Sequence, residues 1–152
     1  IICSDIPHTH LRMASLIGEG FNQRIVNRFV DKALRMEPLT VDDSLQKFGF
    51  LDVRDAAEAI RCILTMDAAN WKPVYNVGSD SGYTLIEIIQ AVKEVFTQEH
   101  LSFPDILTVE SDNTGSTELD TCLLKTDSGF QTMYSLKESI LWILRWYQNH
   151  SA

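Results

Sequence analysis

Apolar and polar positions alternate along the chain with two periods, which predict short strands separated by amphipathic helices. Residues 10–18, HLRMASLIG, have the apolar content of a buried strand that ends at a glycine. Apolar residues then repeat at helical spacing from Ile25 to Leu34, and we expect Pro38 to close this helix. Further strands are predicted at 38–41, 46–53, 74–77 and 105–111.

Three further helices carry the same start signal, a capping box. In this motif an N-cap oxygen and a glutamate three residues later satisfy the free amides of the first turn. The predicted pairs are Asp55 with Glu58, Thr84 with Glu87, and Ser135 with Glu138. Strand and helix therefore follow each other in turn, which predicts an α/β fold with a parallel sheet covered by helices.

Composition narrows the class of protein. The chain has 152 residues, of which 45% are apolar and 22% charged, so we expect residues 1–152 to form a single globular unit. The net charge of −8 would repel a phosphate backbone, so we expect no nucleic-acid partner. No apolar run reaches the roughly 20 residues of a membrane span, and no leader pattern is visible. We expect a cytoplasmic protein without a membrane partner.

Candidate ligand-binding positions lie at the carboxyl ends of the predicted strands, after Ile17, Val53 and Val77, because open parallel sheets bind ligands there. The turn GSDSG at 78–82 has two interpretations, a plain turn or a backbone cradle for a phosphate at the start of the following helix.

No metal site is predicted. His8 and His10 would share one face of a strand, but no third ligand follows at a suitable spacing. The cysteines Cys3, Cys62 and Cys122 stand apart and lack CxxC spacing, and Cys62 is expected to be a buried structural thiol.

Four segments resemble motifs of one family, in the order in which the family has them. LRMASLIGEG resembles LRxSNVYGPG, FGFLDVRDAAEAI resembles RDFVxVxDVAxAI, and VYNVGSDSGYTLIEI resembles YNVGSGxxxSxxEL. LDTCLLKTDSGFQTMYSLKESI resembles LDxSKLxxLLGFxPxxSLEEGI. These are motifs of the C-terminal part of the extended short-chain dehydrogenase/reductase family, the NAD(P)-dependent nucleotide-sugar epimerases and dehydratases.

The resemblance implies a C-terminal fragment: the last strands and helices of a Rossmann-type parallel sheet plus a small α/β substrate-binding subdomain. The family's GxxGxxG turn is not found in the sequence. The Tyr-xxx-Lys pair is not found either, because none of the four tyrosines has a lysine four positions later. We therefore expect the N-terminal dinucleotide-binding half to be absent from this chain. We also expect no catalytic residue within it, and no turnover or tight cofactor binding by the chain alone.

The resemblance also implies positions that contact ligands. Ser15 and Leu16 would lie beside the nicotinamide of NAD or NADP, although a hydroxyl at a strand end can also cap a turn. Asn22 and Arg24 would face the substrate, although Arg24 also suits a solvated helix face. The family's two diphosphate-binding arginines align with Phe48 and Asn113, neither of which has a guanidinium group. Lys47 has two interpretations, a point charge that reaches a phosphate or a solvent-facing residue at the strand edge.

Two hypotheses about function follow. In the first, the parent protein is an NAD(P)-dependent epimerase, dehydratase or reductase that acts on a sugar or sugar nucleotide, with this chain on the substrate side. In the second, the chain is a non-catalytic relative that binds a nucleotide or a partner protein. In either case we expect a homodimer or association through an exposed sheet edge.

Overall fold

The computed structural model describes residues 6–150. Its strands are β1 (His10–Met13), β2 (Ser15–Ile17), β3 (Leu39–Asp42), β4 (Phe48–Asp52), β5 (Val74–Val77), β6 (Gly82–Tyr83) and β7 (Ile106–Val109). Its helices are α1 (Ile25–Leu34), α2 (Val53–Thr65), α3 (Leu85–Gln98), α4 (Cys122–Ser128) and α5 (Leu136–His150), with a 3₁₀ turn, η1, at Ala68–Asn70. Cys3 lies outside the described residues.

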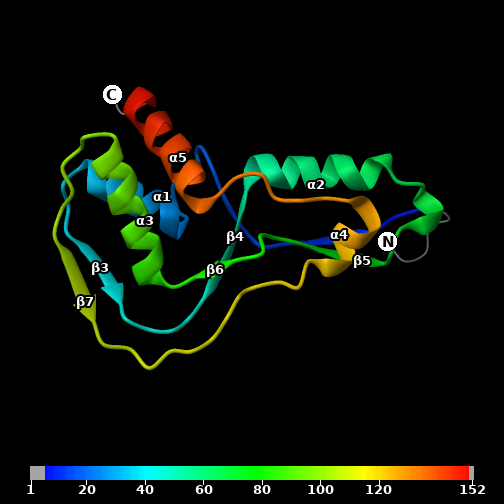
Figure 1. Cartoon of the computed structure of the whole chain (residues 1–152), viewed down its shortest axis with the longest axis horizontal. Coiled ribbons are helices and arrows are strands. Elements are labelled where there is room, and N and C mark those ends of the chain that lie inside the picture. The colour runs from blue at the N-terminus through cyan, green and yellow to red at the C-terminus, as the bar shows by residue number, and fades with distance from the viewer. Residues whose placement is uncertain (1–5, 151–152) are drawn as a thin grey trace.

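The strands form small parallel groups, and the prediction of an α/β fold with parallel strands is confirmed. β1 pairs with β5, β2 with β4, and β3 with β7, all parallel, whereas the short β6 runs antiparallel to β4. In Figure 1 the pair β3 and β7 lies at one end of an elongated molecule, and β5 with α2 and α4 lies at the other.

The strand expected at 10–18 is broken into two. β1 pairs with β5 up to Met13, and β2 pairs with β4 from Ser15 onward. Ala14 lies between them and donates its N–H to the carbonyl of Val77. The interpretation as one buried strand was therefore wrong in part, since β1 alternates between exposed and half-buried residues.

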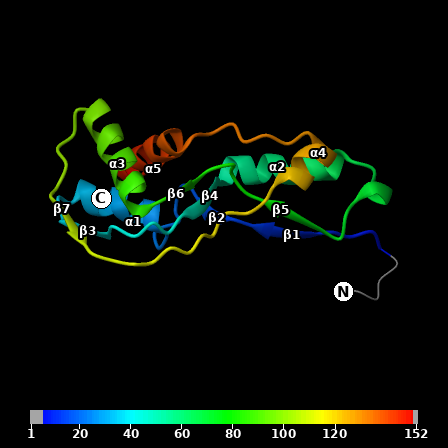
Figure 2. The same cartoon turned by 60° about the horizontal axis from the view of Figure 1, so that its bottom comes forward.

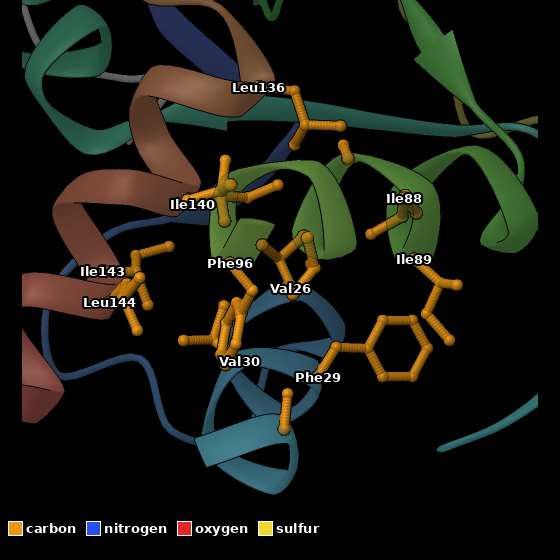
Figure 3. Close-up of a cluster of buried hydrophobic side chains, with 14 of the residues drawn as sticks. Val26, Phe29, Val30, Ile88, Ile89, Phe96, Leu136, Ile140, Ile143 and Leu144 are labelled. Carbon is orange, nitrogen blue, oxygen red and sulfur yellow. The ribbon is translucent and has the colours of Figure 1, made fainter. Parts of the chain in front are cut away.

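One hydrophobic core lies between three helices. Figure 3 shows side chains of α1, α3 and α5 pointing toward one another, among them Val26, Ile89 and Ile140. Val26 and Ile140 are fully buried and Ile89 is 1% exposed. The apolar spacing along these three helices, which the sequence shows, therefore corresponds to the faces that they bury against each other.

A second core joins α2, β5 and α4. Its members include Ala59, Tyr75, Leu124 and Phe130. In Figure 2 the chain runs from α4 back along α2 before it enters α5. Helix α4 was not predicted, because its seven residues are too few for a periodic pattern.

Two of the three predicted capping boxes are confirmed. The amide and hydroxyl of Thr84 donate to Glu87, which in turn donates its amide to Thr84, and Ser135 and Glu138 repeat the arrangement. The third was wrong. Helix α2 begins three residues earlier, at Val53, so its N-cap is Asp52.

Within residues 6–150, no helix is long and apolar enough to cross a bilayer.

Candidate functional site

The carboxyl end of β4 carries a charged network centred on Asp52. Asp52 is 3% exposed. Its carboxylate caps α2 by accepting the amide of Arg54, and it also accepts two guanidinium hydrogen bonds from Arg54, at 2.9 and 2.7 Å. Its second oxygen accepts the hydroxyl of Ser139 on α5 at 2.6 Å. The side chain of Asp52 therefore joins the end of β4 to the starts of α2 and α5, two helices that are far apart in sequence.

Two aromatic rings enclose the guanidinium of Arg54. Its Cζ lies 3.6 Å from the ring centre of Tyr134 and 4.0 Å from that of Trp142. Each ring presents its electron-rich face to the cation, and such contacts are favourable when water is largely excluded. Because the fork of Arg54 is already committed to Asp52, we interpret this residue as a structural cross-link rather than as a ligand-binding arginine.

Asp55, in the first turn of α2, holds the segment that leads into α5. It is 1% exposed, and its two carboxylate oxygens accept the amides of Met133 and Tyr134 at 3.0 and 3.2 Å. The sequence predicted Asp55 as a helix cap. It is instead buried, and its carboxylate satisfies backbone N–H groups of another segment.

The space between these groups is small. A cavity of about 30 Å³ is lined by Asp52, Asp55, Ser79, Tyr83 and Ser139, among others. This volume suits an ordered water and is far below the roughly 300 Å³ at which ligand pockets begin. The network at the end of β4 therefore maintains the fold, and we assign it no acid–base role.

The pKa values of the two buried carboxyl groups, Asp52 and Asp55, are shifted in opposite directions. Burial alone would raise the pKa of Asp52, but hydrogen bonds from Arg54 and Ser139 outweigh it and hold the pKa below the ordinary 3.8. For Asp55, burial dominates, and its pKa lies above 3.8 despite the two backbone amides. Asp52 therefore contributes stability that is present above pH 3.8 and lost as the pH falls further. Asp55 contributes most when protonated, and loses part of that contribution as the pH rises above 3.8.

Two matched variants, Asp52→Asn and Asp55→Asn, should therefore have opposite pH profiles. The deficit of D52N relative to the natural protein should shrink as the pH falls below 3.8, whereas the deficit of D55N should shrink as the pH rises above it. Urea unfolding at a series of pH values measures both. Parallel profiles would contradict these assignments.

Lys47, Phe48 and Asn113, at or beside the positions that align with the family's diphosphate-binding arginines, lie on two segments that are side by side. Lys47 donates its N–H to the carbonyl of Gly115 and accepts the amide of Thr117, so the chain at 113–117 lies beside the start of β4. The Asn113 side chain donates to Gln46 at 3.1 Å. The side chain of Phe48 turns to the core and stacks on Phe50, with ring centres 6.4 Å apart. Within residues 40–53 and 105–121, Lys47 is the one lysine or arginine, and it is exposed.

The other predicted contact residues lie along β2 and the turn after it. Ser15 and Leu16 are half-buried on β2, just after the point where the chain stops pairing with β5 and begins to pair with β4. Asn22 accepts the hydroxyl of Tyr147 at 3.0 Å. Arg24 is exposed at the N-cap of α1, where its side chain makes no capping bond. These four residues lie on a different segment from Lys47, Phe48 and Asn113.

The phosphate-cradle interpretation of GSDSG finds no support in its contacts. Ser79 donates its hydroxyl to the carbonyl of Ser81, and Asp80 pairs with Lys125. An aspartate at its centre would repel an anion. Gly82 at its end forms β6, so we interpret the segment as a turn that enters a short strand.

Cysteine and histidine placements are also resolved. Cys62 is buried, as predicted, and burial raises the pKa of its thiol. His8 precedes β1, which begins at His10, so the two histidines do not share a strand. Within the part of the chain that the structure describes, no three His, Cys, Asp or Glu residues gather as metal ligands would.

A larger groove lies between α3 and the start of α5. Its volume is about 550 Å³, and its walls include Tyr83, Ile86 and Leu136. An ion pair between Glu94 and Lys137 borders it. None of the predicted contact residues lines this groove.

The model of the NAD dependent epimerase/dehydratase family matches residues 4–78. No curated protein is similar enough in sequence to count as a match.

Solved structures share the fold over nearly the whole chain. RMD from Pseudomonas aeruginosa, complexed with NADPH, is 20% identical with a TM-score of 0.79, over 97% of this chain and 50% of that one. UDP-N-acetylglucosamine 4-epimerase from Bacillus cereus is 25% identical with a TM-score of 0.76, over 91% and 45%. UDP-glucuronic acid 4-epimerase from Bacillus cereus, in complex with UDP-glucuronic acid and NAD, is 18% identical with a TM-score of 0.80, over 95% and 46%. The chain thus spans about half the length of the structures that it matches.

Proposed function

We propose that this chain is the substrate-side part of an NAD(P)-dependent epimerase, dehydratase or reductase that acts on a sugar or sugar nucleotide. The main support is the fold match, which covers nearly all of this chain and about half of each enzyme structure. The family model at residues 4–78 agrees with it. In this proposal, the dinucleotide-binding half belongs to a segment outside this chain, and the parent protein is cytoplasmic.

In this proposal, the chain contacts only the nicotinamide end of the dinucleotide, through Ser15 and Leu16. Ser15 and Leu16 lie where β1 gives way to β2, at the point where the parallel strands diverge. In open α/β sheets, ligands bind beyond the carboxyl ends of the strands, and Ser15 and Leu16 follow the carboxyl end of β1. The turn after β5 has an aspartate where a phosphate would need donors. When bound to the parent protein, the cofactor would supply hydride transfer, and this chain would help to orient it.

The substrate proposal turns on the charge around Lys47. A diphosphate is normally held by a planar guanidinium fork, which neither Phe48 nor Asn113 provides. The side chain of Phe48 is also partly buried against the core, where it stacks on Phe50. Lys47, as an exposed point charge, supports weak binding of one phosphate at most. We therefore favour a less phosphorylated sugar or another carbonyl compound over a nucleotide diphosphate sugar.

Turnover by a longer protein tests this proposal. A protein that includes the sequence encoded upstream of Ile1 would be incubated with NAD or NADP and panels of free sugars, sugar phosphates and UDP-sugars. We expect nicotinamide reduction or epimerised product with a free or singly phosphorylated sugar. Turnover of UDP-sugars alone would contradict the substrate proposal but not the enzyme class.

The replacement of both diphosphate-binding arginines, by Phe48 and Asn113, also supports a second candidate function, a non-catalytic binding module. Both aligned arginine positions lack a cation, and the side chains that replace them are used internally, by the core and by Gln46. No turnover with any member of the panels, together with saturable binding of one of them, would favour the binding module.

The end of the molecule that carries β1 presents an incomplete surface. Among the described residues, β1 pairs with β5 alone. An apolar hollow of about 250 Å³ beside it is lined by Leu11, Ile60, Leu64 and Trp71, among others. Leu64 is 67% exposed and Ile60 40%. Parallel sheets are normally covered on both faces, so we propose that this surface packs against the dinucleotide-binding half in the parent protein. In the chain alone, we expect it to drive dimerisation.

A charge placed on this surface should therefore weaken self-association. Leu64→Glu is expected to shift the chain toward monomer in light scattering, because a carboxylate would be desolvated at the interface. Leu45→Glu is the matched control, since Leu45 is 73% exposed and lies outside the hollow. Equal association of both variants and the natural chain would place the contact elsewhere, and a strictly monomeric natural chain would refute it.

A further inference from the structure

The chain between β7 and α4 runs across the start of β4 as an extended strap, which we define as residues 111–118. In Figure 1 this segment is part of the long connection along the lower edge of the molecule. Of its residues, Ser111 is half-buried and the other seven are exposed. The strap contributes no side chain to either hydrophobic core. It is therefore held without the apolar burial that fixes most of the fold.

Polar contacts hold the strap along its length. The amide of Ser111 donates to Asp43 at 2.8 Å, and the Asn113 side chain donates to Gln46. The backbone of Lys47 bonds to Gly115 and Thr117 at 3.0 and 2.9 Å. These bonds lie at exposed or half-exposed positions, where water competes for each donor and acceptor.

Two glycines form the slot in which the strap lies. Gly49 of β4 and Gly82 of β6 are directly opposite in the antiparallel register. Neither has a positive φ, so backbone conformation does not demand glycine at these positions. A Cβ on Gly49 would lie 3.1 Å from the carbonyl oxygen of Thr117 and 3.2 Å from the Cα of Glu118. A Cβ on Gly82 would overlap the side chain of Glu118. The missing side chains are therefore what admits the strap.

The seated strap occupies the backbone groups at the start of β4. It takes the N–H and carbonyl of Lys47, and the amide of Gly49 donates to the Thr117 hydroxyl at 3.2 Å. Any ligand that approached this backbone would have to displace the strap first.

We propose that residues 111–118 are a closing strap that leaves and re-enters the slot of Gly49 and Gly82 while both hydrophobic cores stay intact. The role of the strap as a gate for substrate at Lys47 rests on the proposed function, but its opening does not. Opening breaks few contacts and exposes little apolar surface, so it should cost much less than global unfolding.

Hydrogen exchange on the 152-residue chain without ligand tests the opening. The amides of Lys47, Gly49 and Thr117 should exchange at least about 100-fold faster, relative to their intrinsic rates, than a core amide such as Val92 of α3. Protection equal to that of Val92 would show that the strap opens only by global unfolding and would overturn the proposal. Failure of the enzyme proposal would leave this measurement unaffected.

Matched glycine variants test the slot. Gly49→Ala should raise exchange at Lys47 and Thr117 by about tenfold or more, because the strap backbone must shift to accept the new methyl group. Gly115→Ala is the control, since its nearest neighbour would be the Gln46 side chain at an ordinary 3.7 Å. Thr117→Val, an exposed change, should raise exchange at Gly49 if G49A does not fold. Unchanged exchange in T117V, or equal exchange in G49A and G115A, would refute the slot.

Discussion

Replacing Asp52 by alanine is expected to destabilise the chain by about 3 kcal/mol, measured as the free energy of unfolding in urea. The change removes the N-cap of α2, the partner of the Arg54 fork and the acceptor of the Ser139 hydroxyl together. Loss of one partner from a buried ion pair is costly because the other charge keeps its desolvation penalty. We take the lower end of the usual range because the Arg54 side chain is 30% exposed.

Two further variants divide this loss into its parts. Asp67→Ala removes an aspartate cap from the exposed turn η1, where its carboxylate accepts the amide of Ala69, and should cost less than about 1 kcal/mol. Asp52→Asn keeps an acceptor at the N-cap but loses the charge, so its deficit should lie between those of D52A and D67A. If D52A and D67A cost the same, the network at the end of β4 would contribute nothing beyond capping.

Local patterns in the sequence predicted most of the framework. Helices α1, α3 and α5 have ten or more residues each, and each buries one apolar face, so their periodicity is visible without the fold. The capping residues Thr84 and Ser135 were found for the same reason, since the partner of each lies three residues away.

Long-range partners explain what local patterns missed. Asp52 and Asp55 are both acidic, three residues apart, and both lie near the start of α2, so the sequence does not show which one is the cap. The choice depends on where β4 ends and on the amides of Met133 and Tyr134, more than 70 residues away. Arg54, Tyr134, Ser139 and Trp142 were likewise not predicted as one cluster. The Asp52–Ser139 and Asp55–Tyr134 contacts that frame this cluster span 87 and 79 residues.

For the predicted ligand positions, too, the motifs showed which residues to consider, but their arrangement depends on long-range contacts. Lys47 and Asn113 came from separate motifs, and the strap brings the segments that contain them side by side. The core-facing direction of Phe48 could not be read from the motif, because it depends on packing with Phe50 and the helices beyond. Function at these positions stays a prediction.

The largest effect that we expect concerns the cofactor. In the proposed function, Ser15 and Leu16 contact only one end of a dinucleotide, and the turn after β5 has Asp80 where phosphates would need donors. In the proposed function, the binding energy for the rest of the cofactor comes from a segment outside this chain. The chain alone should therefore bind NADH or NADPH with a Kd no tighter than about 1 mM, against the micromolar range for the longer protein, a difference of about 4 kcal/mol.

Calorimetric titration of NADH and NADPH into the 152-residue chain, and into the protein extended upstream of Ile1, tests whether this chain is the substrate-side part of an NAD(P)-dependent enzyme. We expect no measurable binding to the chain alone and micromolar binding of at least one cofactor to the extended protein. Micromolar binding to the chain alone would contradict the claim that it is the substrate-side part, and absence of binding to both would contradict its assignment to an NAD(P)-dependent enzyme.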